Sequence, residues 1–208
     1  MLAKWIVADA SNRAAFDEAQ REWAEQANYE GFYAQMGGWI EPPTLNAGVL
    51  AIWRDFRAYR EFMERDHDEV PDAQQETLHR ISIVVASVIM RINQSDPRVL
   101  AETAEVVRVS DVTLEANSSP IFVARQMQIW NPALASADGM LGALICRADG
   151  NRDRFLAASF WRDRSALEAF RQELYPAISK RAGTETYIKT MIAYHFCLER
   201  PWLIMKWT

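Results

Sequence analysis

The sequence predicts an α+β fold in which two copies of one β-α-β-β-α-β unit follow each other along the chain. Three observations lead to this prediction. A segment of the first half recurs in the second half at a fixed offset. Each half shows strand and helix patterns in the same order, and the last strand of each half is apolar on both faces.

The recurrence is the first of these observations. Residues 51–62 align with residues 159–170 without a gap at an offset of 108, and Trp, Arg, Asp, Ala and Phe match. The same offset places Gly31 on Gly139, and an offset of 107 places Trp23 on Trp130. A duplication is the economical explanation for a register kept over so many residues.

The first copy contains six expected elements. Ser11 and Asp55 are residue types that cap helices. Alternating or continuous apolar runs predict strands, and apolar residues at three- and four-residue spacing predict helices. The strands are expected at 2–8, 31–40, 47–53 and 81–92, and the helices at about 12–27 and after Asp55.

The second copy repeats this order after a polar linker. Its strands are expected near 104–114, 140–148, 153–162 and 186–198, with helices near 119–136 and 164–181. The domain boundaries are therefore 1–93 for the first repeat, 94–98 for the linker and 99–208 for the second repeat. The tail after Pro201 is apolar, and we expect it to dock on the body or to pair as an extra strand.

The fourth strand of each copy carries apolar residues on both faces, for example Ile83 and Val85 on one side with Val84 and Ala86 on the other. A sheet with one face in water should alternate apolar and polar residues. Helices cover one face, and the sister sheet is the simplest cover for the other. The prediction is thus two ferredoxin-like repeats whose antiparallel sheets pack into one intramolecular α+β barrel.

Composition excludes several classes of partner. The chain is 50% hydrophobic and 25% charged, with a net charge of −5 and no run of Lys or Arg. Nucleic acid and anionic membrane surfaces are therefore not expected as partners. No window approaches the roughly 20 apolar residues of a membrane span, and the first residues lack a signal-peptide pattern. A cytoplasmic protein is expected, either as a monomer with internal pseudo-symmetry or as a homodimer.

The richest group of candidate site residues lies in the first repeat. Gln35, Trp39, Trp53 and His67, with Lys4 and Trp5 on the first strand, could line an aromatic pocket that holds one imidazole and one amide. The alternative is that the tryptophans are core residues and that His67 lies at a solvated, acidic helix end. Asp66, Asp68 and Glu69 flank His67, but consecutive helical residues cannot all reach one metal ion.

Two differences between the copies favour the first repeat as the site. Gly37 and Gly38 interrupt a strand there, as a bulge or a close backbone approach requires, and the second copy has Ile145 and Cys146 instead. The offset also places Tyr175 where the first copy has His67.

The strand order, the two-sided sheet and the junction Ile52-Trp53-Arg54-Asp55 together resemble the dimeric α/β-barrel superfamily. This group includes antibiotic-biosynthesis-type and haem-degrading monooxygenases, chlorite-dismutase-like proteins and stress-response barrels. The segment 35–39, with Trp53 and His67, further resembles a YdbC-like bacterial family. The resemblance implies a pocket between the sheet and the two helices of a repeat.

The haem-degrading branch implies an Asn on the first strand, a Trp on the third and a proximal His on the second helix. Trp53 and His67 are of the residue types that this branch uses. However, residues 2–8 contain no Asn, and the separation of 14 residues between Trp53 and His67 is longer than expected for the motif. The leading hypothesis is a cofactor-independent monooxygenase acting on a small aromatic or quinone-like compound, with His67 as base. The alternatives are a non-catalytic barrel that binds a hydrophobic ligand and, third, a haem-binding protein.

Overall fold

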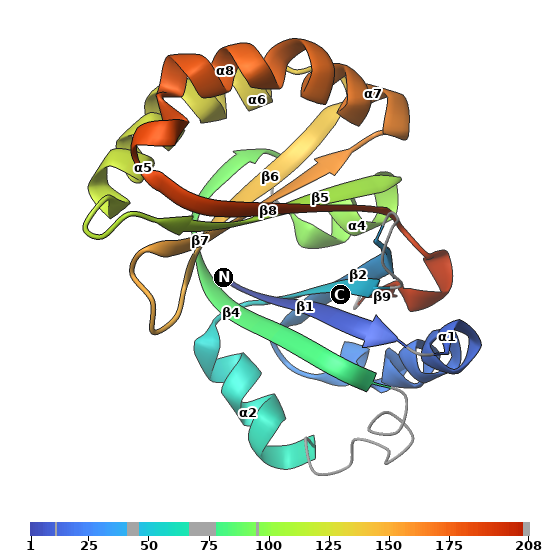
Figure 1. The fold of residues 1–208 in the computed structure, drawn as a ribbon. Coiled ribbons are helices and arrows are strands. Elements are labelled where there is room, and N and C mark those ends of the chain that lie inside the picture. Colours follow the sequence, from blue (N-terminus) through green and yellow to red (C-terminus); the bar gives the residue numbers. More distant parts are fainter. Residues whose placement is uncertain (11, 41–45, 67–77, 95, 206–208) are drawn as a thin grey trace. The chain divides into compact units, whose positions relative to one another are not determined.

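The computed structural model describes residues 1–10, 12–40, 46–66, 78–94 and 96–205, which form two compact units. Unit 1 comprises Met1–Ser87 with Phe196–Thr208, and unit 2 comprises Val88–His195. In each unit the two longest helical stretches cover one face of the sheet (Figure 1). This division differs from the boundary expected at 94–98, because the end of the chain belongs with unit 1 and the long strand β4 continues from unit 1 into unit 2.

Unit 1 has the strand order β4-β1-β3-β2-β9, with antiparallel pairing throughout. Strands one to four in the order 4-1-3-2 are the ferredoxin-like arrangement, which confirms the predicted fold class. The added β9 pairs with β2, so the apolar tail does form an extra strand. The elements are β1 (Leu2–Ala10), α1 (Arg13–Glu22), the 3-10 helix η1 (Trp23–Asn28), β2 (Phe32–Trp39), β3 (Asn46–Trp53), α2 (Phe56–Asp66), β4 (Leu78–Asn93), the 3-10 helix η6 (Arg200–Trp202) and β9 (Ile204–Met205).

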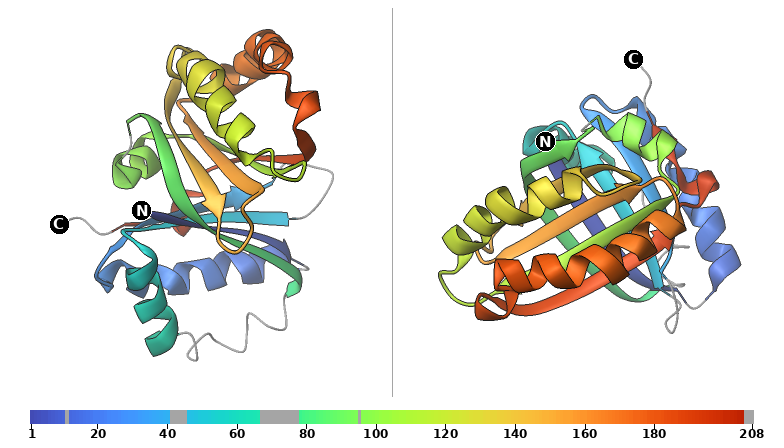
Figure 2. Two further views of the ribbon diagram at one scale, coloured as in Figure 1. Left: turned by 90° about the vertical axis from the view of Figure 1, so that its left-hand side faces the viewer. Right: turned by 90° about the horizontal axis from the view of Figure 1, so that it is seen from above.

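Unit 2 has the strand order β8-β5-β7-β6-β4, so its own four strands repeat the 4-1-3-2 order. Two helical runs lie along this sheet (Figure 2, right). The elements are α4 (Pro97–Thr103), β5 (Val106–Leu114), α5 (Ser119–Arg125), η3 (Gln126–Trp130), α6 (Asn131–Ala135), β6 (Met140–Ala148), β7 (Arg154–Trp161), α7 (Arg164–Ala169), η4 (Phe170–Leu174), α8 (Tyr175–Ala182), the 3-10 helix η5 (Thr184–Thr186) and β8 (Ile188–Cys197).

The aligned segments build the same junction in both units. Asp55 accepts a hydrogen bond from the backbone of Ala58 at 2.8 Å, and Asp163 accepts one from Ala166 at the same distance. These bonds cap the helices that follow, which confirms the expected cap at Asp55. Arg54 also donates to the adjacent Asp55 and to Glu30, which lies just before β2. Arg162 likewise donates to Asp163 and to Asp138, which lies just before β6. The 108-residue register therefore reproduces individual hydrogen bonds as well as the order of the elements.

Three local predictions differ from the structure. The side chain that caps α1 belongs to Asn12, which accepts from Ala15 at 3.2 Å. Residues 97–103, which overlap the end of the linker expected at 94–98, form α4, because Asp96 caps it and Pro97 stands at its first turn, where proline is favoured. The long helices of unit 2 are each interrupted by a π-helical segment, η3 in one and η4 in the other.

Gly37 and Gly38 lie in a regular ladder, so the expected bulge is not there. The register shifts instead between Phe32 and Ala34, and a matching shift lies between Met140 and Gly142 in unit 2. The second explanation, a close backbone approach, applies. A Cβ on Gly37 would lie 2.7 Å from the carbonyl oxygen of Gly48 and 2.9 Å from the Trp202 ring.

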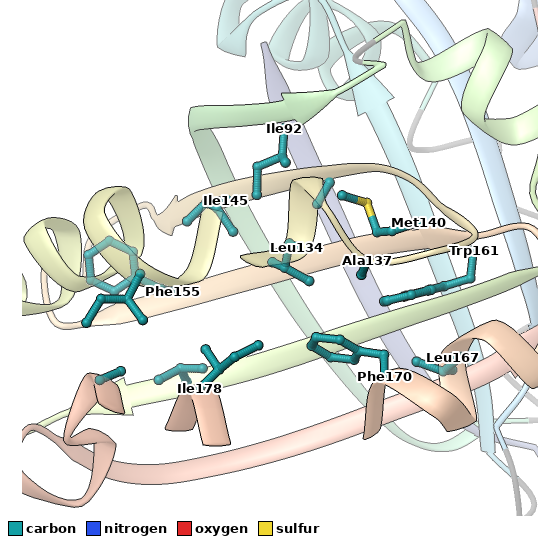
Figure 3. Close-up of a cluster of buried hydrophobic side chains, with 14 of the residues drawn as sticks. Ile92, Leu134, Ala137, Met140, Ile145, Phe155, Trp161, Leu167, Phe170 and Ile178 are labelled. Atoms are coloured by element: carbon teal, nitrogen blue, oxygen red, sulfur yellow. The ribbon is translucent and has the colours of Figure 1, made fainter. Parts of the chain in front are cut away.

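The core of unit 2 lies between its sheet and its helices. Figure 3 shows the side chains that meet there, with Leu134 and Ile178 from the two helical runs and Phe155 and Trp161 from β7. Along the outer strands burial is incomplete, since Ile83 on β4 is 52% exposed and Ile192 on β8 is 55% exposed. The expectation that both faces of these strands are fully covered does not hold, because each is the outermost strand of its own unit. The closure of the sheets into a barrel stays a prediction.

Candidate functional site

A pocket lies in unit 2 between the sheet and the two helical runs. Its cavity volume is about 60 Å³, and the pocket with its mouth holds about 620 Å³ not filled by protein atoms. The cavity is smaller than the roughly 300–1,000 Å³ of typical small-molecule sites, so a bound molecule would also occupy the open mouth. The pocket is lined by Arg108, Ser110, Val112, Phe122, Gln126, Trp130, Leu134, Ala143, Ile145, Ala157, Ala158, Ser159, Phe170, Tyr175, Thr184, Tyr187, Ile188 and Met191.

Aromatic side chains from the helical runs and from the start of β8 form much of the wall. The Trp130 and Tyr175 rings are 5.4 Å apart, and the Phe170 and Tyr175 rings are 6.2 Å apart. Phe122 packs on the Tyr187 ring at 6.5 Å. Such walls provide large apolar faces against which a flat ring can lie.

The two π-helical segments carry part of this wall. Gln126 and Trp130 are the first and last residues of η3, and Phe170 is the first residue of η4. A π turn inserts one extra residue into a helix and rotates the residues after it, and such turns are frequent at functional sites. The Gln126 amide donates to the Asn131 side chain at 2.9 Å and is thereby held in place.

The sheet side of the pocket contains a row of three side chains across β5, β7 and β6. Arg108 pairs with Ser159, and Ser159 pairs with Ala143. The Arg108 guanidinium donates to the Ser110 hydroxyl at 2.5 Å and lies 5.5 Å from the centroid of the Tyr175 ring. Alanine at the third position adds little bulk to the floor of the pocket that the guanidinium also lines.

Arg108 is the one charged side chain among the described residues that line the pocket. Burial lowers the pKa of its guanidinium, and the nearby positive charge of Arg171 acts in the same direction. Burial also raises the pKa of the Tyr187 hydroxyl. Among the described lining residues there is no carboxylate, imidazole or thiol, so the groups usually used as a general base are missing from this set.

The residues predicted as a site lie in unit 1, and the structure brings Lys4, Gln35 and Trp53 together on one face of the sheet. Lys4, Ala51 and Gln35 form a row across β1, β3 and β2, and Trp53 lies on the same face of the sheet. The Lys4 ammonium lies 5.5 Å from the Tyr59 ring, and burial lowers its pKa. Trp53 is 1% exposed and packs against the rings of Phe32, Tyr59 and Phe62.

The other predicted residues are separated from this group. Trp5 follows Lys4 on β1, so it points to the opposite face, where it stacks on Phe196 at 5.9 Å. Trp39 belongs to a second cluster, in which its indole donates to Asp17 at 3.3 Å. His67 lies outside the described residues.

The Lys4 row in unit 1 and the Arg108 row in unit 2 occupy the same place in the two sheets, but the space beside them differs. In unit 1, Trp202 from the tail packs with Phe16 and Trp39 above Gly37 and Val49. Its indole is anchored by a 3.0 Å hydrogen bond to Asp17. At the equivalent positions of unit 2, Ile145 and Ala157 line the open pocket.

Sequence reasoning missed Arg108 and the pocket of unit 2. A signal was available in the strand register, because Arg108 stands two residues after Val106, which pairs with Trp161, as Lys4 stands two residues after Leu2, which pairs with Trp53. A comparison of the two repeats by position along the first strand would have aligned Arg108 with Lys4. The tail residue Trp202 has no counterpart in such an alignment, since it follows both repeats.

Within the part of the chain that the structure describes, no group of three or more His, Cys, Asp or Glu could hold a metal ion. The described lining residues of the pocket offer no imidazole or thiolate as an axial haem ligand. A haem held by either of these ligands does not fit this pocket.

Comparison with protein families divides the chain in two. Residues 122–175, which include most of the pocket's helical wall, match the family model described as antibiotic biosynthesis monooxygenase. Residues 2–85 match a family model described as a domain of unknown function, DUF4937. The chain is 36% identical over 90 residues to the protein YdbC of Bacillus subtilis (strain 168), an alignment that covers 41% of this chain and 75% of YdbC.

Solved structures match over nearly the whole chain. A candidate monooxygenase from Lactobacillus acidophilus superposes with a TM-score of 0.70 at 13% identity, covering 99% of this chain and 96% of that one. An anthrone oxidase-like protein gives 0.72 at 11% identity, with 98% and 92% covered. A haem-degrading enzyme from Listeria monocytogenes gives 0.51 at 12% identity, with 93% and 99% covered. These likenesses show a common fold across both units.

Among the helices in the described ranges, none combines the length and the apolar character needed to cross a membrane.

Proposed function

The chain belongs to the YdbC family, and from this membership and the pocket of unit 2 we propose that it is a cofactor-independent monooxygenase-like enzyme. Its substrate would be a small, flat aromatic or quinone-like compound bound between the aromatic wall and the sheet. The observation that carries the proposal is the apolar pocket beneath two π-helical segments, in the part of the chain that matches the monooxygenase model.

The chemistry proposed is oxidation of an activated methylene, of the kind suggested by the anthrone oxidase-like neighbour. A CH₂ between two aryl rings loses a proton, and the carbanion donates its electrons to O₂. One oxygen atom forms the new C=O and the other leaves as water, so that R₂CH₂ + O₂ gives R₂CO + H₂O. The substrate supplies all four electrons, and the protein has to bind, orient and keep the reacting carbon dry.

A plug at the mouth of the pocket tests this proposal. Met191 lines the mouth and is 39% exposed, so Met191→Trp adds bulk there without disturbing the core. We expect oxygen consumption with an anthrone or quinol panel to fall by about tenfold or more, while the free energy of unfolding changes by less than about 1 kcal/mol. Oxygen uptake is followed with an electrode, and unfolding by circular dichroism in urea.

Met127→Trp is the matched control, because Met127 is 61% exposed, lies on η3 and does not line the pocket. It makes the same chemical change and should leave turnover unaltered. Equal turnover in the two variants would show that the reaction does not take place in this pocket.

A non-catalytic ligand-binding barrel is the second candidate, and one observation favours it. None of the described lining residues is a carboxylate or an imidazole, so the pocket offers no ordinary proton acceptor. Such a protein would bind the same flat compounds, lose that binding in Met191→Trp and consume no oxygen with any of them. Haem binding, the third function expected from the sequence, lacks an imidazole or thiolate ligand in this pocket, and a Soret band in gently purified material would be needed to support it.

The first unit is an alternative place for the reaction, with His67 as the base, Gln35 as a hydrogen-bonding partner and Trp53 as a wall. Trp39, which was also expected as a wall, lies in the separate cluster with Trp202. The buried Lys4 ammonium, whose pKa burial lowers, favours a polar role for this face. If His67 is the base, His67→Ala should abolish turnover and change the free energy of unfolding by less than about 1 kcal/mol. Full turnover in His67→Ala would assign the reaction to unit 2. The proposal includes a cytoplasmic location and a monomer or homodimer.

A further inference from the structure

The guanidinium of Arg108 has the least usual environment of the pocket's polar groups. It is half-buried between the sheet and the helical runs, with the Ser110 hydroxyl at 2.5 Å and the Tyr175 ring at 5.5 Å. Among the residues that the structure describes, it forms no ion pair. Charged side chains are seldom buried without a partner of opposite charge, because the loss of hydration has to be compensated.

Other half-buried arginines of unit 2 do have such partners. Arg154 forms two hydrogen bonds to Asp111, at 2.9 and 2.6 Å, across neighbouring strands. Asp111 is on β5 three residues after Arg108, but its side chain points to the opposite face of the sheet. Arg108 therefore lies in the pocket without access to Asp111, the carboxylate of its own strand.

The guanidinium stays charged in this position. Burial lowers the pKa of Arg108, but an arginine starts so far above neutrality that it does not lose its proton. A fixed positive charge beside an aromatic wall and an open space is complementary to a ring that carries a negative oxygen.

We propose that this pocket selects aromatic monoanions, with an ionised oxygen of the ligand, a phenolate or a carboxylate, bound to the Arg108 guanidinium and its ring against Tyr175 and Trp130. This inference deepens the proposed function, because it states which form of the substrate binds. An anthrone-type compound would bind as its enolate, whose negative oxygen Arg108 stabilises. The proton then leaves to water, and the pocket needs no base of its own.

Two ligands of the same shape and different charge test the inference. 2-Naphthoate and 2-naphthamide share the ring and differ by one negative charge at neutral pH. Calorimetric titration of the purified full chain should show naphthoate binding at least about tenfold more tightly than naphthamide. In Arg108→Gln this preference should vanish through loss of naphthoate affinity, with naphthamide affinity unchanged. Arg108→Lys keeps the charge without the planar fork and should retain part of the preference.

Arg152→Gln is the matched control. Arg152 is exposed in the turn between β6 and β7, so the variant changes net charge equally without touching the pocket. It should keep the full preference for naphthoate. If it loses the preference as Arg108→Gln does, the effect is one of overall charge, and the inference fails.

Three further results would overturn the inference: no naphthoate binding at millimolar concentration, equal affinity for the two ligands in the natural protein, or equal loss of both in a folded Arg108→Gln. The third would mean that Arg108 only shapes the pocket. Naphthoate has no activated methylene, so its binding is independent of turnover. If the protein prefers naphthoate over naphthamide but consumes no oxygen with any substrate, the proposed function is wrong and this inference stands. If the protein turns over a substrate but binds the two ligands equally, this inference is wrong and the proposed function stands.

Discussion

Trp161→Ala is expected to lower the free energy of unfolding by about 3–5 kcal/mol. The Trp161 side chain is 0% exposed, packs on Phe170 with ring centroids 5.0 Å apart, and donates from its indole to the Ser159 hydroxyl at 3.0 Å. Its removal leaves a large cavity and a buried hydroxyl with one partner fewer. The measurement is urea unfolding followed by circular dichroism.

Trp53 is the equivalent residue of unit 1, and its 1% exposure agrees with the alternative interpretation that this tryptophan is a core residue. Trp53→Ala should also cost about 3–5 kcal/mol. The two tryptophans differ in the hydrogen bonding of the indole nitrogen. The Trp53 indole nitrogen is buried without a hydrogen-bond partner in the described part of the chain, since unit 1 has Ala51 where unit 2 has Ser159.

Phenylalanine substitutions use this difference as a control. Trp161→Phe breaks a hydrogen bond, whereas Trp53→Phe removes a buried donor that has none, so Trp161→Phe should cost about 1 kcal/mol more. If Trp161→Ala leaves the protein as stable as the natural chain, Trp161 is not a core residue and the account of this junction is wrong.

Gly139→Ala is expected to destabilise the protein by about 2–5 kcal/mol. Gly139 has φ +73°, a conformation that costs an L residue about 1–2 kcal/mol. A Cβ there would also lie 2.5 Å from the Cβ of Ala166 on the following helix, and such overpacking costs roughly 1–3 kcal/mol. The same unfolding experiment measures the loss.

Gly150 separates the two causes. It has φ +74°, but nothing lies within 4 Å of a Cβ placed on it, so Gly150→Ala should show the conformational cost alone. Adding Ala166→Gly to Gly139→Ala removes the clash and should recover part of the loss, less the roughly 1 kcal/mol that glycine costs in a helix. A Gly139→Ala variant no less stable than Gly150→Ala would contradict the close contact.

Much of the fold could be predicted from the sequence, because its determinants are local or repeated. Asp55 and Asp163 cap helices through side chains three residues before the donor, and the repeat register located both. The interruptions of the unit 2 helices could not be predicted in the same way. A π turn adds one residue to a helix and rotates the residues after it. This shifts the spacing of the apolar residues by only one position, so the pattern around Trp130 still indicates an ordinary helix.

The pocket was harder to predict, because it arises where side chains are too small to fill the space between sheet and helices. The aromatic residues of unit 1 attracted attention in the sequence, yet Trp39 fills space there together with Trp202, a residue almost at the end of the chain. Unit 2 is open where Ala143 and Ala157 line the sheet, and alanines carry no chemical signal. Which of two equivalent spaces is filled depends on a long-range contact that local patterns do not contain.

The filling of unit 1 by Trp202 has a consequence for how this protein can change over time. In a homodimer of a single ferredoxin-like unit, every substitution appears twice, so both binding sites gain or lose it together. Here the two units are encoded separately, and the Trp202 indole anchored on Asp17 fills one of them with no counterpart in the other. One unit can therefore act as a stable scaffold while the other accumulates the substitutions that define a ligand.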